Sequence, residues 1–153
     1  MIVVSDTTAI TTLIKAGREG LLAELFGEVL VPNAVFQELL RSHPILPAFL
    51  RRVEITDSAD VAALGSQLGR GESEAIVLAF ELKADFLLID ERRGRRIAQE
   101  RHLKIIGLLG IVLLAHGRGL IAAVRPLLLE LQSKGRAYLA PELVEATCRS
   151  VGE

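Results

Sequence analysis

Short segments rich in Val, Ile and Leu alternate with segments of helical periodicity from one end of the chain to the other. Gly, Pro and Asp stand at the joints between them, as they commonly do between secondary-structure elements. Strands that alternate with helices are typical of a parallel sheet, because a parallel connection needs a crossover that a helix can provide. We therefore expect a three-layer α/β/α fold with a central, mainly parallel sheet, formed by residues 1–153 as one domain.

Periodicity and turn residues place the individual elements. Strands are expected at residues 2–5, 29–31, 53–55, 86–89 and 104–107, whereas residues 46–52 have no clear pattern. Helices are expected at residues 7–17, 21–26, 32–42, 60–68, 72–83, 92–101, 108–115, 120–133 and 141–149.

The composition favours an aliphatic core. Half of the residues are hydrophobic, but only five Phe and one Tyr are aromatic. Leu, Ile, Val and Ala must therefore fill the interior, which suits helices packed on a parallel sheet. A chain of this length buries about two thirds of its unfolded surface, so no disulfide or second domain is needed.

Several classes of protein are disfavoured. A net charge of −1 provides no overall attraction for nucleic acid or anionic membranes. The single Cys148 cannot form an internal disulfide, and the start of the chain lacks the pattern of a secretion signal, so a cytoplasmic location is expected. The longest uncharged apolar run, residues 105–115, is well short of the ~20 residues of a membrane-spanning helix. Three separated His residues and one Cys offer no zinc-type spacing.

Four acidic residues fall where elements begin or end. Asp6 and Asp90 directly follow expected strands, and the carboxyl ends of strands in open α/β sheets carry ligand sites. Glu38 and Glu74 lie on expected helices of largely apolar character. A carboxylate on a buried element is costly unless it is paired or binds a metal. Each acid also has an ordinary explanation: Asp6 as a helix N-cap, Glu74 as a partner of a helix dipole, and Glu38 as a solvated side chain.

The order and spacing of four motifs resemble the PIN domain, in particular its branch of small stand-alone prokaryotic proteins. The motifs are Ser5-Asp6-Thr7-Thr8, Val31-Pro32 through Glu38-Leu39, Gly71-Glu72-Ser73-Glu74-Ala75-Ile76, and Leu88-Ile89-Asp90-Glu91-Arg92. The likeness extends over almost the whole chain. It implies a ribonuclease that depends on Mg²⁺ or Mn²⁺, often the toxin of a toxin–antitoxin pair.

The resemblance also implies roles for individual residues. Asp6 matches the first family acid, Glu38 the second, Glu74 the third, and either Asp90 or Glu91 the fourth. Most family members have Asp at the third place, so Glu74 departs from the pattern. Mg²⁺ and Mn²⁺ prefer oxygen ligands, which these residues supply. Thr7 resembles a small hydroxyl residue that supports the first acid.

A cluster of arginines follows the fourth acid. Arg92 and Arg96 share one helix face and are candidates for contacts with RNA phosphates, although a solvated helix face would have the same pattern.

Two other functions fit parts of the sequence. A phosphatase of the haloacid dehalogenase type would also place Asp6 after a strand, but Thr8 stands where that family has a second Asp. A PIN-like fold without turnover could bind only RNA or a protein. The proposed partners are an RNA substrate and a small antitoxin protein, and the high apolar content together with the resemblance favours a homodimer.

Overall fold

A five-stranded, entirely parallel sheet forms the centre of the molecule. The structure, a computed structural model, describes residues 1–153. The strands lie in the order β3-β2-β1-β4-β5, with β1 in the middle. Their bounds are β1 (Val3–Ser5), β2 (Val29–Pro32), β3 (Leu50–Val53), β4 (Phe86–Leu88) and β5 (Ile105–Ile106). The expected parallel sheet is confirmed.

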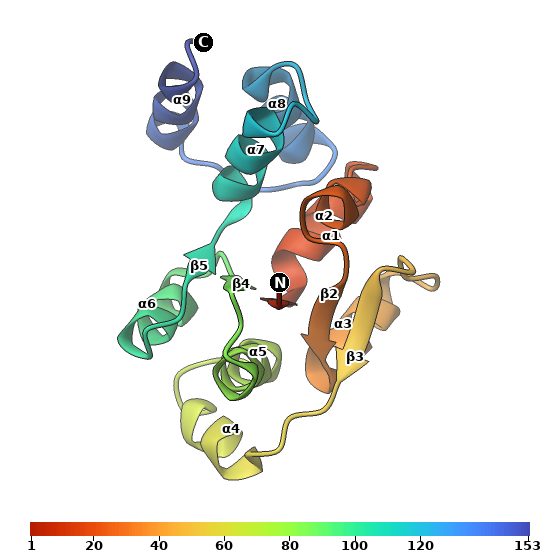
Figure 1. Ribbon diagram of the computed structural model, residues 1–153, viewed down its shortest axis with the longest axis vertical. Coiled ribbons are helices and arrows are strands. Elements are labelled where there is room, and N and C mark those ends of the chain that lie inside the picture. Colours follow the sequence, from red (N-terminus) through yellow and green to blue (C-terminus); the bar gives the residue numbers. More distant parts are fainter.

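Nine helices cover the two faces of this sheet (Figure 1). They are α1 (Thr7–Lys15), α2 (Gly20–Phe26), α3 (Asn33–Ser42), α4 (Ser58–Leu64), α5 (Arg70–Leu82), α6 (Arg92–Glu100), α7 (Leu108–Gly117), α8 (Val124–Ser133) and α9 (Pro141–Ser150). None of them combines the length and the apolar content that crossing a bilayer requires.

Strand residues alternate between two hydrophobic clusters because successive side chains point to opposite faces. Val3 and Leu88 belong to the larger cluster, which α1, α2, α7 and α8 complete. Val4 and Leu87 belong to the smaller cluster, which α4, α5 and α6 complete. The sheet is therefore buried on both faces, which gives the three-layer α/β/α architecture expected from the sequence.

The edge strand and the short α4 helix differ from the sequence prediction. A strand was predicted at residues 53–55, whereas the observed strand β3 spans Leu50–Val53. In it, Leu50 pairs with Val29 and Val53 pairs with Pro32. Pairing with β2 determines which residues form this strand. The exposed Arg51 interrupts the apolar pattern, so the strand could not be located from the sequence alone. The helix predicted at 60–68 begins at Ser58 with Asp57 as its N-cap and ends at Leu64.

The start of α8 also differs from the prediction. A helix expected from residue 120 begins at Val124, where the Glu153 carboxylate accepts hydrogen bonds from the N–H groups of Val124 (2.7 Å) and Arg125 (3.0 Å). The end of the chain thus caps a helix that lies far from it in sequence. Local patterns contain no information on such a cap.

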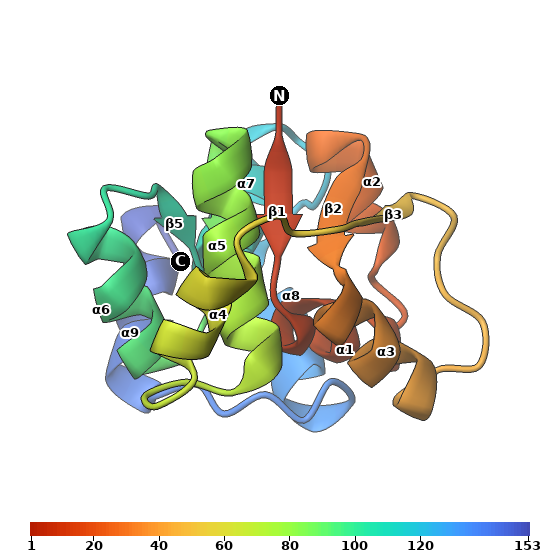
Figure 2. The same ribbon diagram turned by 90° about the horizontal axis from the view of Figure 1, so that it is seen from below.

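The carboxyl ends of the strands all point to one end of the molecule. Figure 2 shows β1 running down to the start of α1, near which α3 also begins. The segment between α8 and α9 passes across the same end of the molecule (Figure 2). Its Gly135 is pressed against α1, since a Cβ there would lie 2.8 Å from the Thr12 carbonyl oxygen and 2.7 Å from that of Leu131.

This close approach predicts that Gly135→Ala destabilises the fold. Overpacking against backbone that cannot move freely costs about 1–3 kcal/mol in free energy of unfolding, measured by urea denaturation. Gly117→Ala is the matched control, because nothing lies within 4 Å of a Cβ at that position near the end of α7. Equal stability of the two variants would contradict the packing described for Gly135.

Candidate functional site

Asp6 stands where β1 ends and α1 begins. Its backbone N–H donates to the Leu88 carbonyl at 3.0 Å, which continues the pairing of β1 with β4. Its Oδ1 accepts a hydrogen bond of 2.6 Å from the N–H of Thr7, so Asp6 caps α1. The side chain is nevertheless buried. Burial raises the pKa of Asp6 to about 6 against the effect of the Thr7 N–H, and the charges of Glu38, Asp90 and Glu91 raise it further.

Glu38 is held at the same place from α3. Its Oε2 accepts a hydrogen bond of 2.5 Å from the Thr7 hydroxyl. A Cβ on Gly71 would lie 2.7 Å from Glu38 Oε1, so the first turn of α5 closely approaches this carboxylate. Thr7 therefore contacts both acids: its N–H binds Asp6 and its hydroxyl binds Glu38.

A hollow of about 250 Å³ lies between these elements. It contains no hydrophobic lining residue, and four carboxylates line it, those of Asp6, Glu38, Glu72 and Glu91. The four come from segments that are far apart in sequence. We call this hollow the acidic depression.

Glu74 does not line the acidic depression. Its Oε1 accepts from the N–H of Ala34 at 3.0 Å, and its Oε2 accepts from Arg70 Nε at 3.0 Å. With both oxygens engaged and the side chain buried, Glu74 joins the first turn of α5 to the start of α3. The glutamate that the motif indicates is therefore occupied by contacts within the protein.

Glu72, two positions earlier on α5, lines the acidic depression. Residues two positions apart in an α-helix are rotated by about 200° about the helix axis. Glu72 and Glu74 therefore point to different sides of α5. Burial raises the pKa of Glu72 to about 7, and the carboxylates of Asp6 and Glu91 contribute. Its Oε2 is buried and has no hydrogen-bond partner. Glu72 was not among the site residues predicted from the sequence. The available signal was the i,i+4 spacing of Arg70 and Glu74, which marks Glu74 as the paired acid.

Of the two adjacent candidates for the fourth acid, Glu91 lines the acidic depression. Its Oε2 accepts from the N–H of Gly94 at 2.8 Å, and this contact lowers the pKa of Glu91. Asp90 caps α7 instead, with its Oδ1 accepting from the N–H of Leu108 at 3.0 Å. Burial raises the pKa of Asp90, while the Leu108 N–H and the charge of Arg95 oppose that rise.

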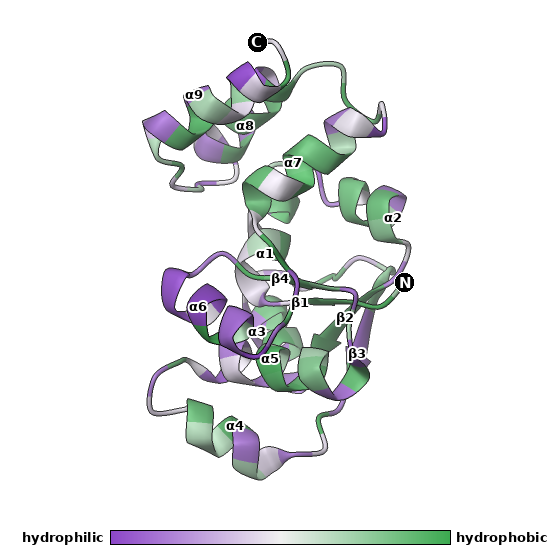
Figure 3. Cartoon of the chain, turned by 60° about the vertical axis from the view of Figure 1, so that its left-hand side comes forward, coloured by the Kyte–Doolittle hydropathy of each residue, from purple (hydrophilic) through white to green (hydrophobic).

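The arginines of α6 are divided between different surroundings. Figure 3 shows α6 as one of the most hydrophilic helices of the molecule. Arg92 is exposed and lines a larger hollow of about 760 Å³ that also includes Asp90 and Arg95. Arg96 is exposed but lines neither hollow. Arg95 was not among the residues predicted from the sequence. It lies three positions after Arg92, which places both on the same side of the helix.

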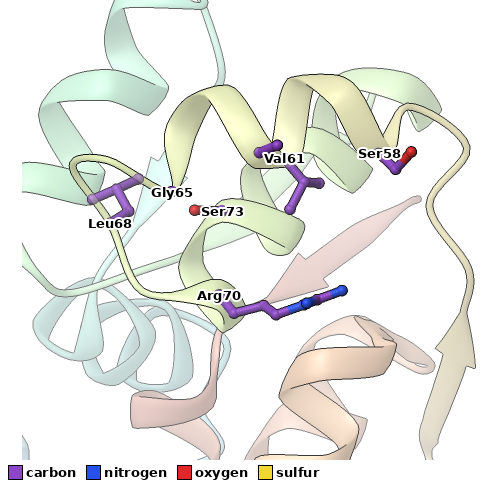
Figure 4. Close-up of a pocket in the computed structure, with 7 residues that line it drawn as sticks. Ser58, Val61, Gly65, Leu68, Arg70 and Ser73 are labelled. Carbon is purple, nitrogen blue, oxygen red and sulfur yellow. The ribbon is translucent and has the colours of Figure 1, made fainter.

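A separate hollow of about 270 Å³ lies between α4 and α5 (Figure 4). Arg70 extends from the start of α5 along its lower side, and Val61, Leu68 and Ser73 are among its other lining residues. It contains no carboxylate, His or Cys. This hollow therefore offers no acid, base or nucleophile of the kinds considered for the site.

The donor set of the acidic depression fits a divalent cation that prefers oxygen. All of its charged lining residues are carboxylates, and the raised pKa values of Asp6 and Glu72 indicate that their negative charge is disfavoured there without a compensating cation. The Oε2 atom of Glu72 has no hydrogen-bond partner and is available as an oxygen ligand for a cation. In the present arrangement no three His, Cys, Asp or Glu side chains form a ready-made cation site.

Comparison with known protein families assigns the fold. The model of the PIN domain family matches residues 2–153, so the chain belongs to this family and the resemblance read from its motifs is confirmed. PIN domains are generally nucleases that cleave phosphodiester bonds, typically in RNA and with divalent metals. Neither the comparison with curated proteins nor that with solved structures gives a significant match.

The raised pKa values predict how stability depends on pH in the absence of metal. The native state holds protons on Asp6 up to about pH 6 and on Glu72 up to about pH 7, whereas the ordinary values are 3.8 and 4.5. Between these limits the folded chain binds more protons than the unfolded chain, so its stability falls as pH rises from about 4 to about 7. Urea denaturation across this range should show a smaller fall for Asp6→Asn, because Asn keeps the cap but cannot titrate. A fall identical to that of wild type would remove Asp6 as its source.

Proposed function

We propose that this PIN domain is an endoribonuclease that depends on Mg²⁺ or Mn²⁺, with Asp6, Glu38, Glu72 and Glu91 as the metal-binding and catalytic carboxylates. The observation that carries the proposal is the burial of Asp6 among carboxylates from three other segments, with its pKa raised to about 6. A fold would not retain such mutual repulsion for stability alone. Relative to the motif, Glu72 replaces Glu74 and Glu91 is preferred to Asp90.

A bound divalent cation would activate water and stabilise negative charge on the attacked phosphate and the leaving oxygen. The residues of the chain have separate tasks around it. Asp6, on a rigid strand end, fixes one ligand position, and the Thr7 hydroxyl fixes the Glu38 carboxylate relative to it. Burial and the neighbouring carboxylates raise the pKa of Glu72 to about 7 in the absence of metal, so Glu72 would release its proton when a cation binds and supply a carboxylate ligand. Thr7 and Glu74 act as positioning residues.

Asp6→Asn provides the direct test of activity. The wild-type protein should cleave RNA in Mg²⁺ or Mn²⁺ and stop with a chelator. Mutation of residues that only support metal ligands typically lowers metal affinity or activity roughly 10- to 100-fold. Loss of a ligand itself should therefore reduce the cleavage rate by roughly a hundredfold or more. Gel assays with purified protein and a check of folding by circular dichroism measure this. Full cleavage by the variant would refute the site, and no cleavage by folded wild type would favour a PIN domain that only binds RNA or protein.

Glu72 and Glu74 distinguish ligand from positioning residue within one helix turn. Mn²⁺ should raise the wild-type melting temperature, because binding to the native state alone stabilises it by RT ln(1 + [L]/Kd). Glu72→Gln should raise the melting temperature without metal, by removing repulsion, and weaken the response to Mn²⁺. Glu74→Ala should weaken that response less than Glu72→Gln does, because it removes a positioning contact and not a ligand. It should also lower the free energy of unfolding by about 1–3 kcal/mol, because the Ala34 N–H loses its partner. The opposite pattern would return Glu74 to the ligand set.

The phosphatase alternative has no residue in its favour beyond Asp6, because Thr8 stands where a second Asp is required. The role of toxin, the antitoxin partner and the homodimer remain predictions from the family resemblance. A phosphatase assay on the same preparation tests the alternative alongside RNA cleavage.

A further inference from the structure

The acidic depression continues into two further hollows along α1. Thr7, Thr8 and Glu38 line both the depression and a polar hollow of about 420 Å³. Thr8, Thr12 and Arg136 line both this polar hollow and the larger hollow of about 760 Å³ beside Asp90. The exposed Thr8 is therefore shared by all three. Together the hollows form one surface track past the carboxylates.

Cationic side chains without ion pairs gather along this track. Lys15, Arg41 and Arg136 line the polar hollow, and Arg92 lines the larger one. None of these four takes part in the ion pairs of the molecule, which involve Arg18, Arg51, Arg70, Arg101 and Arg125. The chain as a whole carries a net charge of −1, so this is a local concentration of available positive charge. It complements a polyanion such as the RNA backbone.

The segment between α8 and α9 forms one wall of the larger hollow. Residues 136–140 line it opposite Ile105 and Leu108. The segment is fixed in place, because the Ala137 N–H donates to the Leu131 carbonyl at 2.9 Å and Gly135 packs against α1. Figure 2 shows this segment crossing the end of the molecule where β1 stops and α1 begins.

Tyr138 is the exposed aromatic residue of this wall. Its side chain is 89% exposed although it lines the hollow, and the adjacent lining is largely apolar. A hydrophobic ring that is held on a fixed segment beside free arginines matches the way in which proteins bind single strands. Bases stack on aromatic rings while cations bind the phosphates. A duplex could not use the ring in this way, because its bases are already stacked within the helix.

We propose that residues 136–140 form a wall of the RNA-binding groove, in which an unpaired base stacks on Tyr138 and neighbouring phosphates contact Arg136 and Arg92. The inference rests on the proposed ribonuclease function and specifies its substrate as a single-stranded segment of RNA. The groove leads the strand past Thr8 to the carboxylates of the acidic depression.

Tyr138 is also a built-in probe of this contact. It is the only Tyr, and the chain has no Trp, so tyrosine emission reports on this side chain alone. Binding should be measured in Mg²⁺ with the Asp6→Asn protein, which is not expected to cut the strand. Labelled oligoadenylate should raise fluorescence anisotropy and quench the tyrosine emission over the same concentrations. An abasic strand of equal length should still bind through its phosphates but leave the emission unquenched after correction for absorbed light.

Substitutions complete the experiment. Tyr138→Ala should weaken oligoadenylate binding roughly five- to 150-fold, the range for loss of one stacked base, whereas Tyr138→Phe should retain the wild-type affinity. Phe80→Ala is the matched control, because this exposed aromatic residue lies outside the groove near Arg101 and should leave binding unchanged.

The outcomes separate this inference from the proposed function. The proposed groove would be refuted if RNA binding were unaffected by Tyr138→Ala or left the tyrosine emission unquenched. A protein ligand would then be the favoured occupant of this hollow. Quenching by oligoadenylate and weaker binding by Tyr138→Ala would support the groove even if the wild-type protein failed to cleave RNA. Failure to cleave would refute only the proposed nuclease activity. Cleavage by wild type that is equally fast with Tyr138→Ala at limiting RNA concentration would refute the groove and keep the nuclease.

Discussion

The parallel pairing of β1 with β4 is the contact on which the site depends. It aligns Ser5 with Leu88, and the hydrogen bond from the Asp6 N–H to the Leu88 carbonyl extends it by one step. The segments that follow the two strands must then leave the sheet side by side. Asp6 and Glu91 are therefore brought to one place although 84 positions separate them in the sequence. Both strands are short, and all of their residues except Ser5 are apolar, so hydrophobic burial on both faces holds this pairing.

Stability and function oppose each other at the acidic depression. The sheet buries Asp6, and burial together with neighbouring carboxylates raises its pKa to about 6. Glu72 is affected in the same way and keeps one oxygen without a partner. Other acids of the molecule are relieved by ordinary contacts: Asp60 pairs with Arg101, and Glu130 pairs with Arg18. Destabilising charge that is left uncompensated at one place is a common mark of a functional site.

The two glutamates at the start of α5 show how a fold assigns different tasks to similar residues. Glu74 binds the Ala34 N–H and Arg70, and so fixes α3 against α5. Glu38 lies on α3 and Glu72 on α5, so this bracket sets the distance between two carboxylates of the acidic depression. A residue that matches a family motif can thus support the site without contacting a metal.

The sequence by itself determined the α/β architecture and the aliphatic core, because alternation and composition are local properties. It also predicted Asp6 from a strand end, whereas Glu38 was indicated by the family resemblance. Only the tertiary structure decided the edge strand β3, since β2 sets its register. It also decided which glutamate of α5 lines the acidic depression, since Glu74 binds the start of α3 whereas Glu72 lies at the depression. The same holds for the wall formed by residues 136–140, where packing of Gly135 on α1 brings Arg136 and Tyr138 to the same hollow as Thr8, which lies more than a hundred residues earlier in the sequence. Local patterns determine which elements form, whereas long-range packing determines which side chains meet.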